Sequence, residues 1–200
     1  MQEFFSPAES DPPKGTEELL ESPEGVRSES SRRVILPEGY QLDLGKGKSL
    51  PLTAVIHEGG YYANAIFIDD QIKGRDIDRQ QSSAYLIMIY GDVPDAGKIN
   101  LNLQLLDITL RDGQKKKYLY IADRYVPMAL RAQGIGRKLL SIAENIATEN
   151  GCSLIASALM AEDPKDQERL ITSKENAGYQ TIKNGGGVIS IKDLRKDNLS

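Results

Sequence analysis

The sequence predicts an α+β fold in which antiparallel strands are followed by a glycine-rich turn and a helix. Residues Ala84–Tyr90 form a continuous apolar run of strand length, and Ile99–Leu110 alternates between apolar and polar residues with a period of two. From Arg137 to Thr148 the apolar residues instead recur at helical spacing. The two strand-like segments are separated by a short polar turn, so they are expected to pair side by side as antiparallel neighbours.

The first 33 residues differ in composition from the rest of the chain. They are rich in Ser, Pro, Glu and Gly, carry eight acidic and four basic residues, and show no sustained apolar periodicity. Such a segment cannot bury enough surface to offset its ordering entropy, so residues 1–33 are expected to be a disordered acidic arm. A docking arm that orders on a protein partner is the alternative. Residues 34–200 are expected to form the folded domain, with the clearest signals over 82–194.

The next segment, residues 34–79, is the least regular part of the domain. Val34–Leu36, Leu50–Ile56 and Tyr61–Ile68 look strand-like or ambiguous, and glycines interrupt them repeatedly. No clear helix is predicted in this region.

The later elements follow one another with recognisable boundaries. Gly91–Gly97 reads as a turn, and residues 111–117 form a polar hairpin connection into a strand that contains Leu119 and Ile121. Asn150–Gly151 is a fitting helix C-cap, and residues 152–159 follow it as a buried strand. Asp163–Pro164 supplies an N-cap and a first-turn proline for a helix that runs to about residue 176, and a hairpin of residues 180–183 and 188–191 closes the domain.

Composition limits the class of protein. The 200-residue chain has a formal net charge of -4, so no global basic field argues for nucleic-acid binding. Its one cysteine, Cys152, excludes an internal disulfide framework and is expected to fill the core. The lone histidine, His57, has no second ligand type clustered with it, so no metal site is expected. The sequence shows neither a signal-peptide layout nor a membrane-spanning apolar run, and a cytoplasmic protein is the default expectation.

The hexapeptide Arg131–Gly136 lies between a predicted strand and a predicted helix. A helix start leaves backbone N–H groups without partners and carries partial positive charge, so it favours anions. Gly134 and Gly136 let the backbone approach a phosphate closely. Arg131, Arg137 and Lys138 add positive charge around that point. The segment therefore predicts a site for a phosphate-bearing ligand.

Two common phosphate-binding loops do not fit these residues. A dinucleotide-binding fold requires a third glycine three positions after Gly136, where this chain has Leu139. A nucleotide P-loop requires Gly-Lys-Ser or Gly-Lys-Thr, but Gly136 is followed by Arg137-Lys138-Leu139.

The remaining pattern resembles the GNAT superfamily of acetyl-CoA-dependent N-acyltransferases. Its signature is Arg or Gln, two residues, Gly, one residue, then Gly or Ala, which Arg131–Gly136 matches. The resemblance implies a three-layer fold with a mixed, mostly antiparallel central sheet and helices on both faces. It also implies that the loop amides hold the pyrophosphate of coenzyme A, while the preceding strand end pairs with the pantetheine arm. The implied cofactor-binding residues are Arg124, Tyr125, Val126, Arg131, Ala132, Gln133, Gly134, Ile135, Gly136 and Arg137.

The same resemblance suggests candidates for the chemistry of acyl transfer. The amide near Val126 would polarise the thioester carbonyl. Lys174 occupies the position, four residues before Gly178-Tyr179, at which the family commonly has a tyrosine that protonates the thiolate, and a lysine of lowered pKa could serve there. Asp123 and Glu162 are the candidates for the base, with a water chain as the alternative to both.

Three functions are compatible with the sequence. The first is an N-acetyltransferase that transfers an acetyl group from acetyl-CoA directly to an amine of a small molecule or protein, without a metal. The second is a catalytically silent acyl-CoA-binding or structural module. The third is an interaction protein whose acidic arm recruits partners. No membrane or nucleic-acid partner is expected, and many members of the family are homodimers, so the resemblance allows a homodimer.

Overall fold

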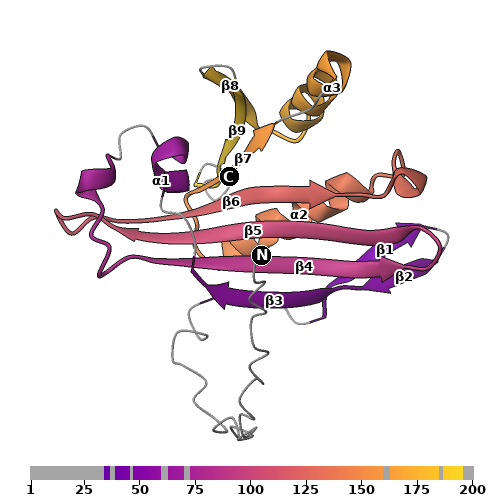
Figure 1. The fold of residues 1–200 in the computed structure, drawn as a ribbon, viewed down its shortest axis with the longest axis horizontal. Coiled ribbons are helices and arrows are strands. Elements are labelled where there is room, and N and C mark those ends of the chain that lie inside the picture. The colour runs from indigo at the N-terminus through magenta and orange to yellow at the C-terminus, as the bar shows by residue number, and fades with distance from the viewer. Residues whose placement is uncertain are drawn as a thin grey trace, which may run out of the picture.

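The computed structural model describes residues 34–36, 39–45, 47–59, 63–69, 73–159, 163–184 and 187–195 (Figure 1). The predicted acidic arm, residues 1–33, lies outside the described residues. No helix in the described ranges is long and apolar enough to span a membrane.

The described part of the chain is built on a seven-stranded mixed sheet, of spatial order β3-β4-β5-β6-β7-β9-β8. Every neighbouring pair is antiparallel except β6 and β7, which run parallel. The mixed, mostly antiparallel sheet predicted from the sequence is therefore confirmed. The strands are β3 (Thr53–Glu58), β4 (Ser83–Val93), β5 (Gly97–Thr109), β6 (Lys115–Tyr125), β7 (Leu154–Leu159), β8 (Gln180–Asn184) and β9 (Gly187–Asp193).

A smaller two-stranded ribbon and the helices complete the described fold. The ribbon pairs β1 (Gln41–Gly45) with β2 (Lys48–Pro51). The α-helices are α1 (Ala63–Ile68), α2 (Ile135–Glu149) and α3 (Pro164–Glu175), and two 3-10 turns are η2 (Gly74–Asp76) and η3 (Met128–Leu130). The predicted caps are present: Asp163 accepts a hydrogen bond from the Lys165 amide at 2.7 Å, and Asn150 caps α2.

An apolar core lies on each face of the sheet. Odd-numbered residues of β5, such as Leu101 and Leu103, pack in one apolar cluster with the buried stripe of α2. Even-numbered residues Leu106 and Ile108 pack with α1 in a second cluster on the other face. Because side chains alternate along a strand, the period-two pattern of β5 supplies both cores. Helices on both faces are therefore confirmed as well.

Two segments that were strand-like or ambiguous in the sequence form no strand in the structure. Tyr61 and Tyr62 lie outside the described residues, and Ala63–Ile68 forms helix α1, in which Ala65 and Ile68 point into the second core at helical spacing. The helix is held at its end by Asp69, which accepts hydrogen bonds from Tyr118 and Lys116 on β6, each at 2.7 Å. Val34–Leu36 forms no strand, and Val34 instead packs in the α2-side core. These long-range contacts with the sheet, rather than the local pattern, determine the conformation.

The predicted turn after β4 is shorter than expected. β4 continues through Val93, so only Pro94–Ala96 separate it from β5, which begins at Gly97. Backbone pairing of Val93 with Gly97 closes this hairpin.

The assignment of the two sheet faces can be tested by shortening side chains. Leu101→Ala removes a side chain that is fully buried against α2, and we expect a loss of about 2–5 kcal/mol in the free energy of unfolding. Leu86→Ala is the matched control, because Leu86 is 38% exposed on the neighbouring strand and its loss should cost about 1 kcal/mol or less. Urea unfolding measures both values, and equal losses would contradict the assignment.

Candidate functional site

The sheet opens into a fork between β6 and β7. The two strands pair from Tyr118 with Leu154 as far as Ile121 with Ser157. Beyond that point β6 continues to Tyr125, while β7 turns away with β9 and β8 (Figure 1). The last residues of β6 therefore keep β5 on one side and, within the described part of the chain, have no strand on the other.

An irregularity in β6 sets which side chains face the fork. Asn102 pairs with Asp123 and Leu103 pairs with Ile121, so Ala122 is an extra residue that bulges from the ladder. The bulge shifts the alternation by one position. As a result Arg124 lies on the α2 side of the sheet, whereas Asp123 is exposed on the opposite face.

The open edge of β6 presents backbone groups to a ligand. The Tyr125 amide donates to Asn100 Oδ1 at 3.1 Å and therefore faces β5. Because amides point alternately to either side of a strand, the Arg124 amide faces the edge that β7 has left. An extended chain bearing amide groups can pair with such an edge.

The chain leaves this edge through a tightly held loop. Ala132 and Gly134 have positive φ angles of 61° and 75°, and Gly134 is the N-cap residue of α2. Glycine adopts this conformation without steric cost, which explains the residue at the cap. The Arg131 Nε donates to the Val126 carbonyl at 3.2 Å, and Gln133 Nε2 donates to the Ala129 carbonyl at 3.2 Å. These bonds fix the loop against the end of β6.

The first turn of α2 is joined directly to β6. The Arg124 guanidinium donates to the Gly136 carbonyl at 2.9 Å. Ile135 is 1% exposed and anchors the helix start in the core, so the helix amides at this end are held in a fixed direction. A fixed helix start with exposed glycine backbone is suited to an anion.

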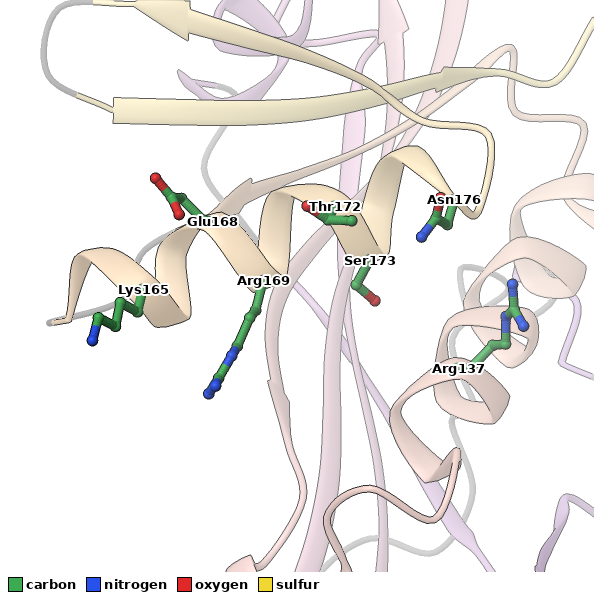
Figure 2. Close-up of a pocket in the computed structure, with 7 residues that line it drawn as sticks. All are labelled: Arg137, Lys165, Glu168, Arg169, Thr172, Ser173 and Asn176. Atoms are coloured by element: carbon green, nitrogen blue, oxygen red, sulfur yellow. The ribbon is translucent and has the colours of Figure 1, made fainter.

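A cavity of 720 Å³ lies between the start of α2 and α3 (Figure 2). Arg137 projects from α2, across from the C-terminal end of α3, and Lys165 and Arg169 project from α3. Three basic side chains thus surround the cavity, with Glu168 as its acidic residue. Arg169 also forms an exposed ion pair with Asp166 at 3.1 Å. The cavity therefore adds positive charge beside the loop.

Two features of this charge distribution differ from the sequence prediction. Lys138 was expected to add charge at the loop, but its ammonium is bonded to the carbonyl and carboxylate of Asp43 on β1, at 2.7 and 2.8 Å. Lys165 and Arg169 were missed. Their spacing of four residues on a capped helix was a usable signal, since it places both on one helix face.

A buried group of charged residues lies on the α2 side of the fork. Lys174, in the last turn of α3, is 3% exposed, and its Nζ lies 4.2 Å from the ring centroid of Tyr179. Burial, and then the positive charge of Arg124, lower the pKa of Lys174 to about 7, while Glu144 on α2 opposes this shift. Burial, and then Glu144, raise the pKa of Tyr179 above its ordinary value. Burial lowers the pKa of Arg124.

Two of the three predicted catalytic residues lie at the fork, on opposite faces of the sheet. Lys174 is close to Arg124 in the fork, and Asp123 is exposed on the other face of the same strand edge. Glu162 lies outside the described residues. Cys152 is buried in the α2-side core, and burial raises the pKa of its thiol to about 12, which agrees with its expected role as a core residue. Within the described ranges, no group of three or more His, Cys, Asp or Glu residues could hold a metal ion.

A forked sheet whose open strand leads through a glycine turn into a helix start defines an acyltransferase-type fold. The model of the acetyltransferase (GNAT) family matches residues 67–168, which contain the fork strands, the loop and α2. The chain belongs to this family. A comparison with curated proteins gives no match.

Solved structures with a similar fold have low sequence identity to this chain. The GNAT domain of S. lividans PAT is 13% identical, with 78% of this chain and 97% of that chain covered and a TM-score of 0.43. A chain of the NatC complex bound to Gag peptide and CoA is 17% identical, with 69% and 82% covered and a TM-score of 0.41. Arabidopsis thaliana NAA60 in complex with a bisubstrate analogue is 12% identical, with 56% and 76% covered and a TM-score of 0.39. The family assignment therefore depends on the family model.

The buried amine of Lys174 should make stability depend on pH. Its pKa falls from 10.5 to about 7 on folding, so between these values the unfolded chain binds more protons than the folded chain. The destabilisation is complete below about pH 7 and decreases as the pH rises toward 10.5. Lys174→Met should therefore stabilise the protein by a few kcal/mol at acidic pH and by less at alkaline pH.

Urea unfolding of the wild type and Lys174→Met across this pH range measures the difference. Lys183→Met is the control, because Lys183 is exposed on β8. A stability gain for Lys174→Met that is independent of pH would contradict the lowered pKa.

Proposed function

We propose that the protein is an N-acetyltransferase that transfers an acetyl group from acetyl-CoA directly to an amine. The observation that carries this proposal is the continuous path from the open edge of β6, through the fixed loop, to the start of α2. This path offers strand amides to a pantetheine arm and helix amides to a pyrophosphate, in the order in which coenzyme A carries them. Membership of the acetyltransferase family supports the same assignment.

Each part of the site has a proposed role in holding the cosubstrate. The edge residues Arg124, Tyr125 and Val126 pair with the pantetheine arm, and the loop residues 131–136 surround the pyrophosphate. Arg137, with Lys165 and Arg169 across the cavity, faces the phosphates and the nucleoside end. Arginine and lysine suit phosphate oxygens because their hydrogen bonds to a charged acceptor are short and strong.

The chemistry requires groups on both sides of the bound thioester. Asp123 is the proposed base for the incoming ammonium group, directly or through water, because it is exposed on the face opposite α2. The Val126 amide is the proposed donor to the oxyanion. Lys174, on the α2 side, is the proposed acid that gives its proton to the departing thiolate. Its pKa of about 7 suits a group that must both give and regain a proton at neutral pH.

The acceptor is proposed to approach from the face of Asp123. Among the described elements, helix α1 packs on the end of this face that contains Leu106 and Ile108. Near the fork the face exposes Met88 and Tyr125, which are 37% and 47% exposed. An amine attached to an apolar group fits these surroundings, with the carboxylate of Asp123 attracting its charge.

Binding of the cosubstrate can be tested at the glycine that begins α2. Gly134→Glu places a side chain and a negative charge at the proposed pyrophosphate site, so we expect isothermal titration calorimetry to detect acetyl-CoA binding to the wild type but not to this variant. Gly113→Glu is a matched control, because Gly113 has a similar φ of 87° in a hairpin turn remote from the loop and has nothing near its Cβ position. It carries the same added charge and comparable backbone strain.

The outcomes of this titration separate the proposals. Equal loss of binding in both glycine variants would show that backbone strain, not the loop, is responsible. No binding of acetyl-CoA or free CoA by the folded wild type would overturn the enzyme proposal.

The role of the cavity can be tested by removing one charge. Arg137→Ala should weaken acetyl-CoA binding about tenfold, since a hydrogen bond to a charged group contributes on the order of 1.5 kcal/mol. The effect should diminish as salt is added, because exposed charges are screened. Arg75→Ala is the control, since Arg75 is exposed beside a different hollow. Unchanged affinity of Arg137→Ala in calorimetry at low salt would remove Arg137 from the site.

A catalytically silent acyl-CoA-binding module is the second candidate. It is favoured by Lys174, whose Nζ is shielded from solvent and has no hydrogen-bond partner among the described residues. Release of free CoA thiol in the presence of a panel of amines distinguishes the two. Turnover by the wild type that is lost in Gly134→Glu eliminates the silent module, and tight binding without turnover supports it.

A further inference from the structure

The amine of Lys174 is enclosed by elements that meet at the fork. Arg124 faces it from β6, Glu144 from α2, and Tyr179 from the residues that follow α3. Lys192 on β9 lies on the same aromatic ring, 6.0 Å from its centroid, and forms an ion pair with Glu144 at 3.4 Å. Lys174 thus lies between the two parts of the sheet that separate, beside the strand edge proposed to hold the pantetheine arm.

Packing does not account for an amine at this position. Within the described residues Lys174 Nζ has no hydrogen-bond partner, and its contact is with the face of the Tyr179 ring. A buried polar group without a hydrogen bond costs free energy, and a methionine would fill similar space without that cost. The Lys174 amine therefore lowers the stability of the fold and places a reactive group in its interior.

The chemical state of this amine is unusual for a lysine. With a pKa of about 7, a large fraction of Lys174 is neutral at physiological pH, whereas an ordinary lysine with a pKa near 10.4 is roughly one-thousandth neutral. A neutral, desolvated amine is a nucleophile toward carbonyl carbon. Among the described residues, the carboxylate of Glu144 acts on Lys174 and raises its pKa, but Glu144 is also paired with Lys192 at 3.4 Å. Burial and the charge of Arg124 outweigh it, so the pKa of Lys174 remains lowered.

The proposed anion site is linked to Arg124, which helps to enclose this amine. The Arg124 guanidinium is bonded to the Gly136 carbonyl at the start of α2, where a pyrophosphate is proposed to bind. A charged phosphate oxygen is a stronger acceptor than a carbonyl, so a bound pyrophosphate draws the guanidinium toward itself. Movement of Arg124 away from Lys174 opens part of the enclosure, while burial, the larger cause of the lowered pKa of Lys174, remains.

We propose that Lys174 is a self-acylation site: when no acceptor amine is bound, acyl-CoA held at the loop transfers its acyl group to Lys174 Nζ. This proposal rests on the proposed acyl-CoA site. In the step, the neutral amine attacks the thioester carbonyl, a C–N bond forms and the C–S bond breaks. The proton lost from nitrogen passes to the CoA thiolate, so the products are Nε-acyl-lysine and CoA thiol, with no oxidation or reduction. Proximity within one site makes this transfer effectively unimolecular.

The modification has a consequence for the enzyme. An amide nitrogen can neither accept nor donate a proton near neutral pH, so an acylated Lys174 loses its proposed role as an acid. It also occupies the fork with a larger, uncharged group. Self-acylation therefore limits turnover when acyl-CoA is abundant and the acceptor is scarce.

Intact-mass spectrometry of the 200-residue chain, incubated with acetyl-CoA and no acceptor, tests the proposal. We expect addition of one acetyl group, located at Lys174 by peptide mapping and absent in Lys174→Arg. Lys183→Arg, a substitution at an exposed lysine, should be acetylated like the wild type. The rate should rise with pH and level off above about 7, whereas non-enzymatic acetylation of an ordinary lysine continues to rise toward its pKa near 10.4.

Calorimetry on the same samples separates failure of this proposal from failure of the proposed function. Acetyl-CoA binding without a modified Lys174, or acetylation spread over surface lysines, overturns self-acylation and leaves the binding site intact. Absence of binding overturns both. If Lys174→Arg does not fold, as judged by circular dichroism, Lys174→Met replaces it, and Gly134→Glu should abolish Lys174 acetylation while keeping the amine in place.

Discussion

The separation of β6 from β7 after Ile121 and Ser157 is the constraint on which the rest of the site depends. A buried strand edge normally satisfies its amides by pairing, and here the pairing stops while β6 continues for four more residues. The adjacent loop and α2 are fixed at the end of that unpaired stretch, through Arg131 bonded to Val126 and Arg124 bonded to Gly136. The open edge therefore leads directly to the helix start.

The bulge at Ala122 places Asp123 and Arg124 on opposite faces of this strand edge. Without the extra residue, Asp123 would lie on the α2 side and Arg124 on the exposed side. With it, the exposed carboxylate and the buried basic group lie on opposite sides of the same strand. An acyl group held on the edge between them can meet an acceptor on one side and lose its thiolate toward the other.

Lys174 is an example of a reactive side chain whose burial lowers the stability of the fold. Burial of Lys174, and then the nearby positive charge of Arg124, lower the pKa of this amine. Tyr179 contributes a ring face to the Lys174 ammonium, and Glu144 contributes a carboxylate that Lys192 balances. With a pKa of about 7, Lys174 exchanges its proton near neutral pH, as both of its proposed roles require.

The sequence by itself determined the features that depend on local periodicity and local backbone chemistry. The alternation in β5, the helical spacing in α2, the glycine at the start of α2 and the Asp163-Pro164 cap are encoded within a few residues, and the structure confirms them. Only the tertiary structure decided the surroundings of Asp123, Lys138 and Lys174, because these come from segments distant in the chain: a bulge opposite Asn102, a carboxylate on β1, and a guanidinium on β6. A pKa, an ion pair and the face that a side chain occupies depend on packing between elements, which no local pattern specifies.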